Sequence, residues 1–165
     1  MAAKFEVIND NPIRTSGSYI SRGKQGSGFG TLWADAIDTG LAISLFDPSR
    51  QFGALAHVTR DYSNRGSSSE SIINNLLSEL GMSDLEEGDC PGLEAAIVGA
   101  SDVSTAVRDY LLRLNILIVG EDLGTVPLGR EVHMHCNDKT VRVYRYTPSY
   151  TKSPKIPNIQ DFCIS

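Results

Sequence analysis

The chain has 165 residues, of which 41% are apolar, so it is long enough to bury a hydrophobic core without disulfide bonds or a structural metal. Fifteen Lys and Arg against twenty Asp and Glu give a formal net charge of −5, which argues against nucleic acid as a partner because phosphates attract positive surfaces. The chain has no apolar run near the ~18 residues that cross a bilayer and no signal-peptide stretch at its start, so we expect a cytoplasmic protein without membrane insertion.

Residues 1–33 are predicted to hold one short strand followed by a loop. Phe5 and Val7 alternate with charged residues, which is typical of a strand. Between Thr15 and Thr31 there are five Gly and four Ser, a composition that favours a mobile loop over a regular element. No helical pattern follows these glycines, so they do not match a phosphate-binding loop.

Two strands and a helix are predicted next. Leu41–Phe46 is nearly continuous in apolar residues and ends at turn residues, and Ala54–Val58 is a second buried strand. Ser67 stands three residues before Glu70, the spacing of a capping box. The apolar residues that follow at helical intervals, before Gly81 ends the helix, are Ile72, Ile73, Leu76, Leu77 and Leu80.

The second half of the chain predicts a further helix among strands. Leu93–Val98 and Ile116–Val119 are expected as buried strands, and between them Ser101 or Asp102 can cap a helix. The apolar face of that helix consists of Val103, Val107, Tyr110, Leu111 and Leu114. The final predicted features are a loop over Gly120–Gly129 and a hairpin formed by Glu131–Cys136 and Thr140–Tyr146.

These elements predict an α/β domain of mixed β-sheet with two main helices. We divide the chain into a head at residues 1–33, the α/β domain at residues 34–146, and an extended tail with three prolines at residues 147–165.

Four segments between Ala34 and Tyr144 follow one another at compatible spacing. They are Asp38–Asp47, Phe52–His57, Leu93–Ala100, and the pair Glu121–Gly124 and Gly129–Val132. In this order they resemble the CheD family of chemoreceptor glutamine deamidases, whose patterns are T-L-G-L-G-S-C, G-G-M-A-H, a strand before a glycine pair, and E-D-x-G-G with G-R-x-V. The resemblance covers about two thirds of the chain and implies a compact α/β sandwich.

The resemblance also implies a mechanism, in which a Cys thiolate attacks a glutamine side-chain amide and a His acts as base and then as acid. A gap-free alignment places His57 on the catalytic His and Gly40 on the nucleophilic Cys. It places Ala34 on the Thr of the family's triad and Asp38-Thr39 on its G-S. Because glycine has no side-chain nucleophile, we expect a catalytically inactive homologue in which His57 is a remnant base.

Such a homologue is expected to bind a chemoreceptor cytoplasmic helix or a CheC-like regulatory protein. In that interpretation Asp122, Gly124 and Arg130 belong to a loop that rims the pocket near His57. The structural alternative remains open, with glycine serving a positive φ and Arg130 pairing with Glu121 or Asp122.

Two active-enzyme alternatives are kept. In the first, a relocated nucleophile retains glutamine deamidase activity, with Thr39 as a weak candidate and Cys90 or Cys136 reaching in from another element. In the second, Ile37–Gly40 is the D-T-G core of an aspartic protease-like hydrolase, with Ile118–Gly120 packed beneath it. The two predicted helices between these segments argue against the second alternative, because such half-domains are almost wholly β.

The remaining cysteines and histidines predict no cofactor and no metal site. Cys90, Cys136 and Cys163 are odd in number and widely spaced, so we expect reduced thiols. His133 and His135 share one strand face, but two imidazoles are not a metal site, and a solvent-facing row is the interpretation we favour.

Overall fold

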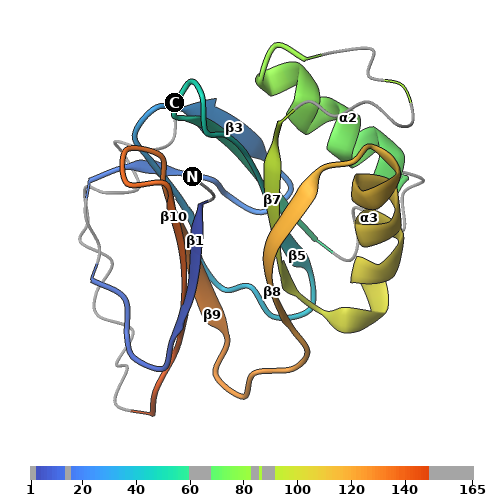
Figure 1. Cartoon of the computed structure of the whole chain (residues 1–165). Helices are drawn as coiled ribbons and strands as arrows, with labels where there is room; N and C mark the ends of the chain where they lie inside the picture. The colour runs from blue at the N-terminus through green and yellow to red at the C-terminus, as the bar shows by residue number, and fades with distance from the viewer. Residues whose placement is uncertain (1–2, 14–15, 60–67, 83–85, 87–91, 149–165) are drawn as a thin grey trace.

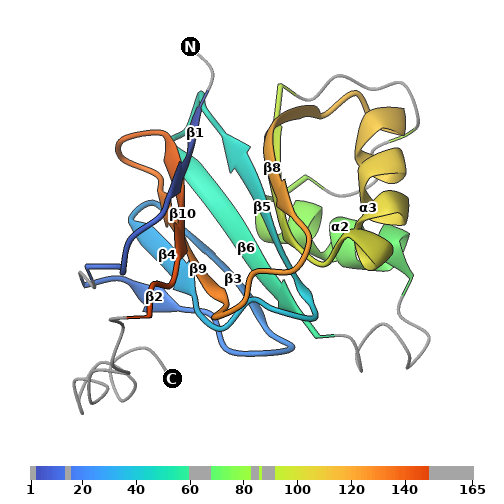
Figure 2. The same ribbon diagram turned by 90° about the horizontal axis from the view of Figure 1, so that it is seen from below.

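Two five-stranded sheets face each other in the computed structural model, and helices cover the outer face of one of them (Figures 1 and 2). The structure describes residues 3–13, 16–59, 68–82, 86 and 92–148. The fold is a mixed α/β sandwich with two mixed sheets and, in these ranges, two helices, which confirms the predicted fold class.

The first sheet, sheet A, has the strand order β1-β10-β9-β4-β2. Its strands are β1 (Lys4–Ile8), β10 (Thr140–Arg145), β9 (Arg130–His135), β4 (Thr31–Ala34) and β2 (Ser18–Tyr19). The β9–β10 hairpin is antiparallel, whereas β1 runs parallel to β10 and β2 runs parallel to β4. The predicted hairpin is therefore confirmed, and it forms the centre of sheet A.

The second sheet, sheet B, has the strand order β3-β6-β5-β7-β8. Its strands are β3 (Gln25–Gly28), β6 (Phe52–Val58), β5 (Leu41–Asp47), β7 (Glu94–Gly99) and β8 (Leu117–Leu123). Helix α2 (Ser69–Glu79) follows β6, and α3 (Ser101–Arg113) makes the crossover between the parallel strands β7 and β8. Both helices lie on the outer face of sheet B (Figure 2).

Sheet B is buried on both faces, which explains the continuous apolar run of β5. Ile43 and Leu45 belong to the core under the helices, whereas Ala42 and Phe46 belong to the core between the sheets. Because side chains alternate across a strand, a strand between two apolar layers needs apolar residues at every position. The inner face of sheet B, which meets sheet A, is also where its polar residues His57 and Asp122 lie, and both are buried.

The glycine-rich segment between Thr15 and Thr31 differs from the prediction. Ser18–Tyr19 and Gln25–Gly28 form β2 and β3, so the prediction of a mobile loop is wrong at those positions. The reason is tertiary: β3 pairs with β6, and a Cβ at Gly26 would lie 2.8 Å from Ile20 Cδ1. The head therefore contributes strands to both sheets of the α/β sandwich.

The ends of three elements also differ from the prediction. Strand β8 continues through Leu123, so the loop begins later than Gly120. Ser68 caps α2, its side chain accepting a hydrogen bond from Ser71 N, whereas Ser67 lies outside the described residues. Helix α3 begins at Ser101, so Ala100 rather than Ser101 or Asp102 is its N-cap residue, and alanine has no side-chain oxygen to cap the helix.

The described residues contain no helix that is both long enough and apolar enough to span a bilayer.

Candidate functional site

A groove opens at the end of sheet B where β5 begins and β6 ends. Its volume is about 360 Å³, and its lining consists of Arg22, Ala36, Asp38, Thr39, Gly40, His57, Val58 and Thr59. We call it the His57 groove. The structure thus brings together the aligned positions Gly40 and His57 and the weak nucleophile candidate Thr39.

His57 reaches the groove from the inner face of sheet B. It pairs with Ala42, which belongs to the core between the sheets, and only 3% of the residue is exposed. The Gly23 amide donates to the His57 carbonyl at 2.8 Å, and the His57 amide donates to the Lys24 carbonyl at 3.0 Å. These two bonds bring the segment that contains Arg22 to the groove.

One nitrogen of the His57 ring has a hydrogen-bond partner, and the other has none among the described residues. The ring makes a hydrogen bond to the Ile20 backbone, while Nδ1 is buried and has no hydrogen-bond partner among the described residues. Burial lowers the pKa of His57, opposed by the charge of Asp35, and the charge of Arg22 lowers it further. The imidazole is therefore neutral at pH 7, and Nδ1 can accept a hydrogen bond.

The backbone beside position 40 leaves room only for glycine. A Cβ on Gly40 would lie 2.1 Å from the Val58 carbonyl oxygen and 3.2 Å from Thr59 Cα. The Gly40 carbonyl accepts a hydrogen bond from the Ala100 amide at 3.0 Å, which fixes the other side of the residue. In this backbone, position 40 has no space for a cysteine side chain.

Thr39 and Asp38 are exposed and bonded to each other. Asp38 Oδ1 accepts from the Thr39 amide at 2.6 Å and from its hydroxyl at 3.5 Å. Gly120 of the suggested D-T-G partner segment instead pairs with Ala96 of β7, and Phe5 packs against it. Ala96 is level with Ser44, four residues along β5 from Gly40, which is on the order of 13 Å away. The structure does not bring the two protease-like segments together.

Cys136 is the one candidate cysteine within the described residues. It is fully buried between the sheets, and burial raises the pKa of its thiol to about 11. It packs near Gly53, which is four residues, or on the order of 13 Å, from His57 along β6. A protonated thiol at that distance cannot act with His57. Cys90 and Cys163 lie outside the described residues.

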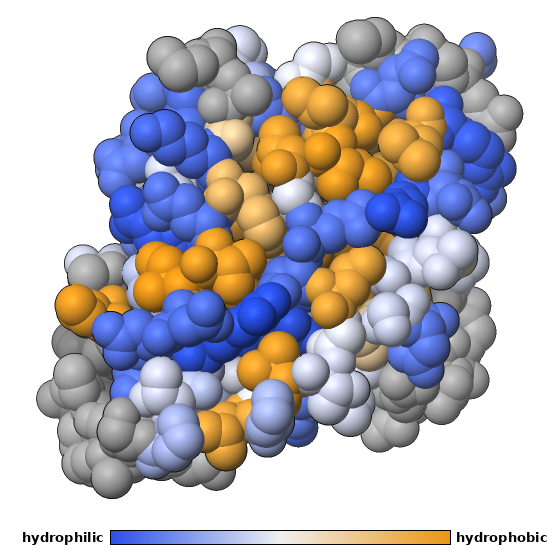
Figure 3. Space-filling view, turned by 60° about the horizontal axis from the view of Figure 1, so that its bottom comes forward, coloured by the Kyte–Doolittle hydropathy of each residue, from blue (hydrophilic) through white to orange (hydrophobic). Residues whose placement is uncertain are grey.

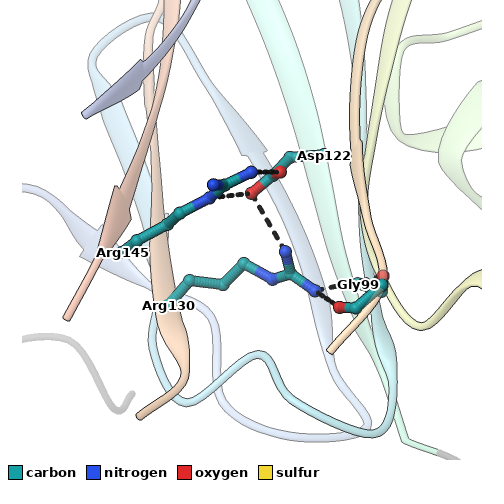
Figure 4. A network of polar contacts seen from close by, with 5 residues as sticks. Gly99, Asp122, Arg130 and Arg145 are labelled. Atoms are coloured by element: carbon teal, nitrogen blue, oxygen red, sulfur yellow. Dashed lines mark hydrogen bonds and ion pairs between the residues drawn. The ribbon is translucent and has the colours of Figure 1, made fainter. Parts of the chain in front are cut away.

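Asp122 and Arg130 form a buried ion pair (Figure 4), and neither residue lines the His57 groove. Arg130 is fully buried and donates to Asp122 Oδ2 at 3.0 Å, and Arg145 donates to both oxygens of the same carboxylate. Burial alone would raise the pKa of Asp122, but the bonds from Arg145 and the charge of Arg130 lower it overall. The predicted pairing is confirmed with Asp122, whereas Glu121 pairs with Arg108.

Arg130 also closes the turn that follows β8. It donates to the carbonyls of Gly99 and Gly124, and the Gly124 amide donates to the Gly99 carbonyl at 2.8 Å. Gly124 has a φ of 104°, which favours glycine. Asp122, Gly124 and Arg130 do not line the His57 groove. Their contacts join β7, β8 and β9 and hold the loop between β8 and β9.

That loop borders a second hollow next to the groove. The hollow has a volume of about 390 Å³, and its lining is mixed. The apolar and aromatic part consists of Val126, Pro127, Leu128, Tyr146 and Pro148, and the polar part of Arg22, Asp38 and Thr147. We call it the Leu128 hollow. It shares Arg22, Ala36 and Asp38 with the His57 groove, so the two lie side by side.

The histidines of β9 do not form the solvent-facing row that the sequence predicts. His133 is 2% exposed, its Nε2 lies 2.5 Å from Glu131 Oε2, and its ring packs edge-on to Tyr144. His135 Nδ1 lies 3.0 Å from the Thr31 hydroxyl. In the described part of the chain, no group of three or more His, Cys, Asp or Glu is arranged to hold a metal ion.

Two groove residues, Arg22 and Thr59, were not predicted from the sequence, because neither belongs to a motif. The role of Arg145 beside Asp122 could have been predicted from the sequence. Arg145 is the register partner of Arg130 across the predicted hairpin, and two arginines directly opposite each other repel unless an acidic group lies beside them.

No protein-family model and no curated protein sequence matches this chain.

Proposed function

We propose that this chain is a catalytically inactive relative of the CheD deamidases that binds a glutamine side chain of a chemoreceptor helix in the His57 groove. The observation that carries the proposal is the unpartnered Nδ1 of buried His57 at the groove, beside a position where only glycine fits. A buried polar atom without a partner costs stability, which is expected where a ligand supplies the missing bond.

The groove's chemistry suits a carboxamide. A primary amide has an NH₂ group that donates and an oxygen that accepts. His57 Nδ1 can accept from the NH₂ group, while Arg22, which also lines the groove, can donate to the oxygen. Asp38 adds a second acceptor at the rim, since it is exposed and lines the same groove.

Lack of hydrolysis is supported by the absence of a suitable nucleophile within the described residues. Deamidation through a thiolate forms a thioester and releases ammonia, and water then frees the carboxylate. Gly40 has no side chain, and the thiol of Cys136 is buried and protonated. The Thr39 hydroxyl donates to Asp38, and no hydrogen bond joins it to His57 among the described residues.

The experiment compares binding and turnover on one glutamine-bearing receptor fragment. We expect wild type to bind the fragment and the His57→Ala variant to bind it about tenfold more weakly, because a lost hydrogen bond to a buried group costs ~1 to 3 kcal/mol. Mass spectrometry should show no gain of about one mass unit per glutamine, the change that deamidation produces. A fragment with glutamate at each glutamine position serves as the matched ligand control.

Time-dependent conversion by wild type that disappears in His57→Ala would show an active deamidase and overturn the proposal. If thiol alkylation also abolished that conversion, the relocated nucleophile would be a cysteine. Equal binding of the glutamine and glutamate fragments would remove the carboxamide from the proposal.

A further inference from the structure

The Leu128 hollow adjoins the His57 groove and adds apolar residues to its surroundings. The groove contributes His57, Thr39 and Thr59, whereas the hollow contributes three apolar loop residues and the ring of Tyr146. Arg22 and Asp38 stand at the boundary and belong to both. Because they border both cavities, a partner whose glutamine they contact in the groove would present a neighbouring side chain to the hollow.

The loop that presents Leu128 is held at both ends. Arg130 donates to the Gly124 carbonyl, the Gly129 amide donates to Val126 O at 3.1 Å, and the Tyr146 amide donates to Gly129 O at 3.0 Å. The Tyr146 hydroxyl also accepts from the Ala36 amide at 3.3 Å. The hollow is therefore preformed, which reduces the entropy lost on binding.

Leu128 remains 49% exposed although it is anchored in this way. The end of the molecule that carries this loop and the β4–β5 connection shows apolar patches divided by a hydrophilic band (Figure 3). An exposed apolar side chain on a fixed loop beside a hollow of about 390 Å³ fits the insertion of a partner's side chains better than a large flat interface.

We propose that the Leu128 hollow receives an aliphatic side chain of the same partner segment whose glutamine enters the His57 groove. The inference rests on the proposed function and adds a specificity rule to it: the preferred partner carries Leu, Ile, Val or Met near its glutamine. The unpartnered His57 Nδ1 defines one end of the bound segment, and the apolar loop residues of the hollow define the other.

The test uses the full-length protein and a set of acetylated, amidated alanine–lysine peptides, each with one fluorescent label and one glutamine. Leucine is placed at each position on either side of the glutamine in turn, and the peptide without leucine is the reference. We expect one or two leucine positions to tighten binding about tenfold, equivalent to ~1.4 kcal/mol, measured by fluorescence anisotropy.

Two leucines of similar exposure give matched variants. Leu128→Asp places a charge in the hollow and should reduce the ratio of leucine to reference affinity to about one. Leu112→Asp changes a residue on α3 that is 54% exposed and outside both cavities, and it should keep the full ratio. The milder Leu128→Ala should fall between them, and thermal melts show whether each variant is folded.

The outcomes distinguish a failure of this inference from a failure of the proposed function. If peptides bind through glutamine but leucine has no effect at any position, the inference fails and the proposed function stands. If no glutamine peptide binds, both fail. If light scattering shows a wild-type dimer that Leu128→Asp converts to a monomer, a second copy covers the hollow and the inference is overturned.

Discussion

His57 and Asp122 lie at opposite ends of one row on the inner face of sheet B. The row runs from His57 through Ala42 and Val98 to Asp122, one residue from each of four adjacent strands. Both polar side chains are at least 95% buried, but their surroundings differ. Asp122 is satisfied by two arginines, whereas His57 keeps one nitrogen without a partner in the described part of the chain and lines a groove.

This difference separates a stabilising polar group from one available to a ligand. A buried carboxylate with good partners holds elements together, and removing a partner leaves a charge without compensation. A buried acceptor without a partner lowers the stability of the fold, and it can gain a bond when a ligand enters. Substitutions at the two ends should therefore affect different measurements.

The largest effect is expected at Arg130. Arg130→Met should lower the free energy of unfolding by ~3 to 5 kcal/mol, because it removes one charge of a buried pair and leaves the Gly99 and Gly124 carbonyls without this donor. Chemical denaturation measures the change. Arg113→Met is the control, since the pair of Arg113 with Glu70 is about half exposed and should contribute at most ~1 kcal/mol. Similar losses in both variants would contradict the structural role of the network.

The same network should respond to acid. The pKa of Asp122 is lowered in the folded state, so its ion pairs contribute fully above the unfolded value of about 3.9 and are lost as the pH falls through the lower folded value. Asp122→Asn should flatten the decline in unfolding free energy below about pH 4. Asp47→Asn is the comparison, because the pKa of Asp47 is also lowered, by hydrogen bonds from Ser49 and Arg50 that outweigh its burial. Its partner Arg50 is 44% exposed, so we expect less flattening there.

A smaller loss is expected at the glycine beside the groove. Gly40→Ala should cost ~1 to 3 kcal/mol of stability, because its Cβ would meet the Val58 carbonyl at 2.1 Å and the backbone must move. Gly30→Ala is the matched control, since its Cβ would meet no atom within 4 Å, and it should change stability by less than ~0.5 kcal/mol. Gly40→Cys should create no deamidase for the same steric reason. Turnover in that single variant would contradict this account.

Elements with a strong apolar pattern could be predicted from the sequence. The continuous run in β5 and the helical spacing in α2 both reflect burial against a neighbouring layer, which the sequence encodes directly. Strand β3 has no such pattern, because its strand conformation depends on pairing with β6 and on the fit of Gly26 against Ile20. Local composition therefore indicated a loop where tertiary pairing forms a strand.

The candidate site divides in the same way. His57 was identified through the resemblance, and its burial follows from its place in an apolar strand. Arg22 reaches it only because the Gly23 and Lys24 backbones bond to His57, a contact between segments far apart in the sequence. The pairing of Asp122 with Arg130 could be predicted from the sequence. Its separation from the groove could not, because it depends on the order of the strands in sheet B.

The smallest change in stability is expected at His57 itself. His57→Leu should alter the unfolding free energy by no more than ~1 kcal/mol at pH 7, because removing an unsatisfied nitrogen offsets the lost bond to the Ile20 backbone. Burial lowers the pKa of His57, so wild type should lose stability as the pH falls below about 6.5, where the unfolded chain takes up a proton first. The variant should lack this part of the decline while losing glutamine-dependent binding.

A substitution of a second histidine, His135, tests whether a loss of peptide binding is specific to His57 or follows from the loss of any buried imidazole. Burial also lowers the pKa of His135, but it lies on sheet A outside the His57 groove. His135→Leu should therefore remove its own share of the pH dependence and leave peptide affinity unchanged. If both variants lost binding equally, the effect would arise from the fold. If only His57→Leu lost binding, and did so at nearly unchanged stability, the unsatisfied end of the row would serve a ligand and the satisfied end would serve the fold.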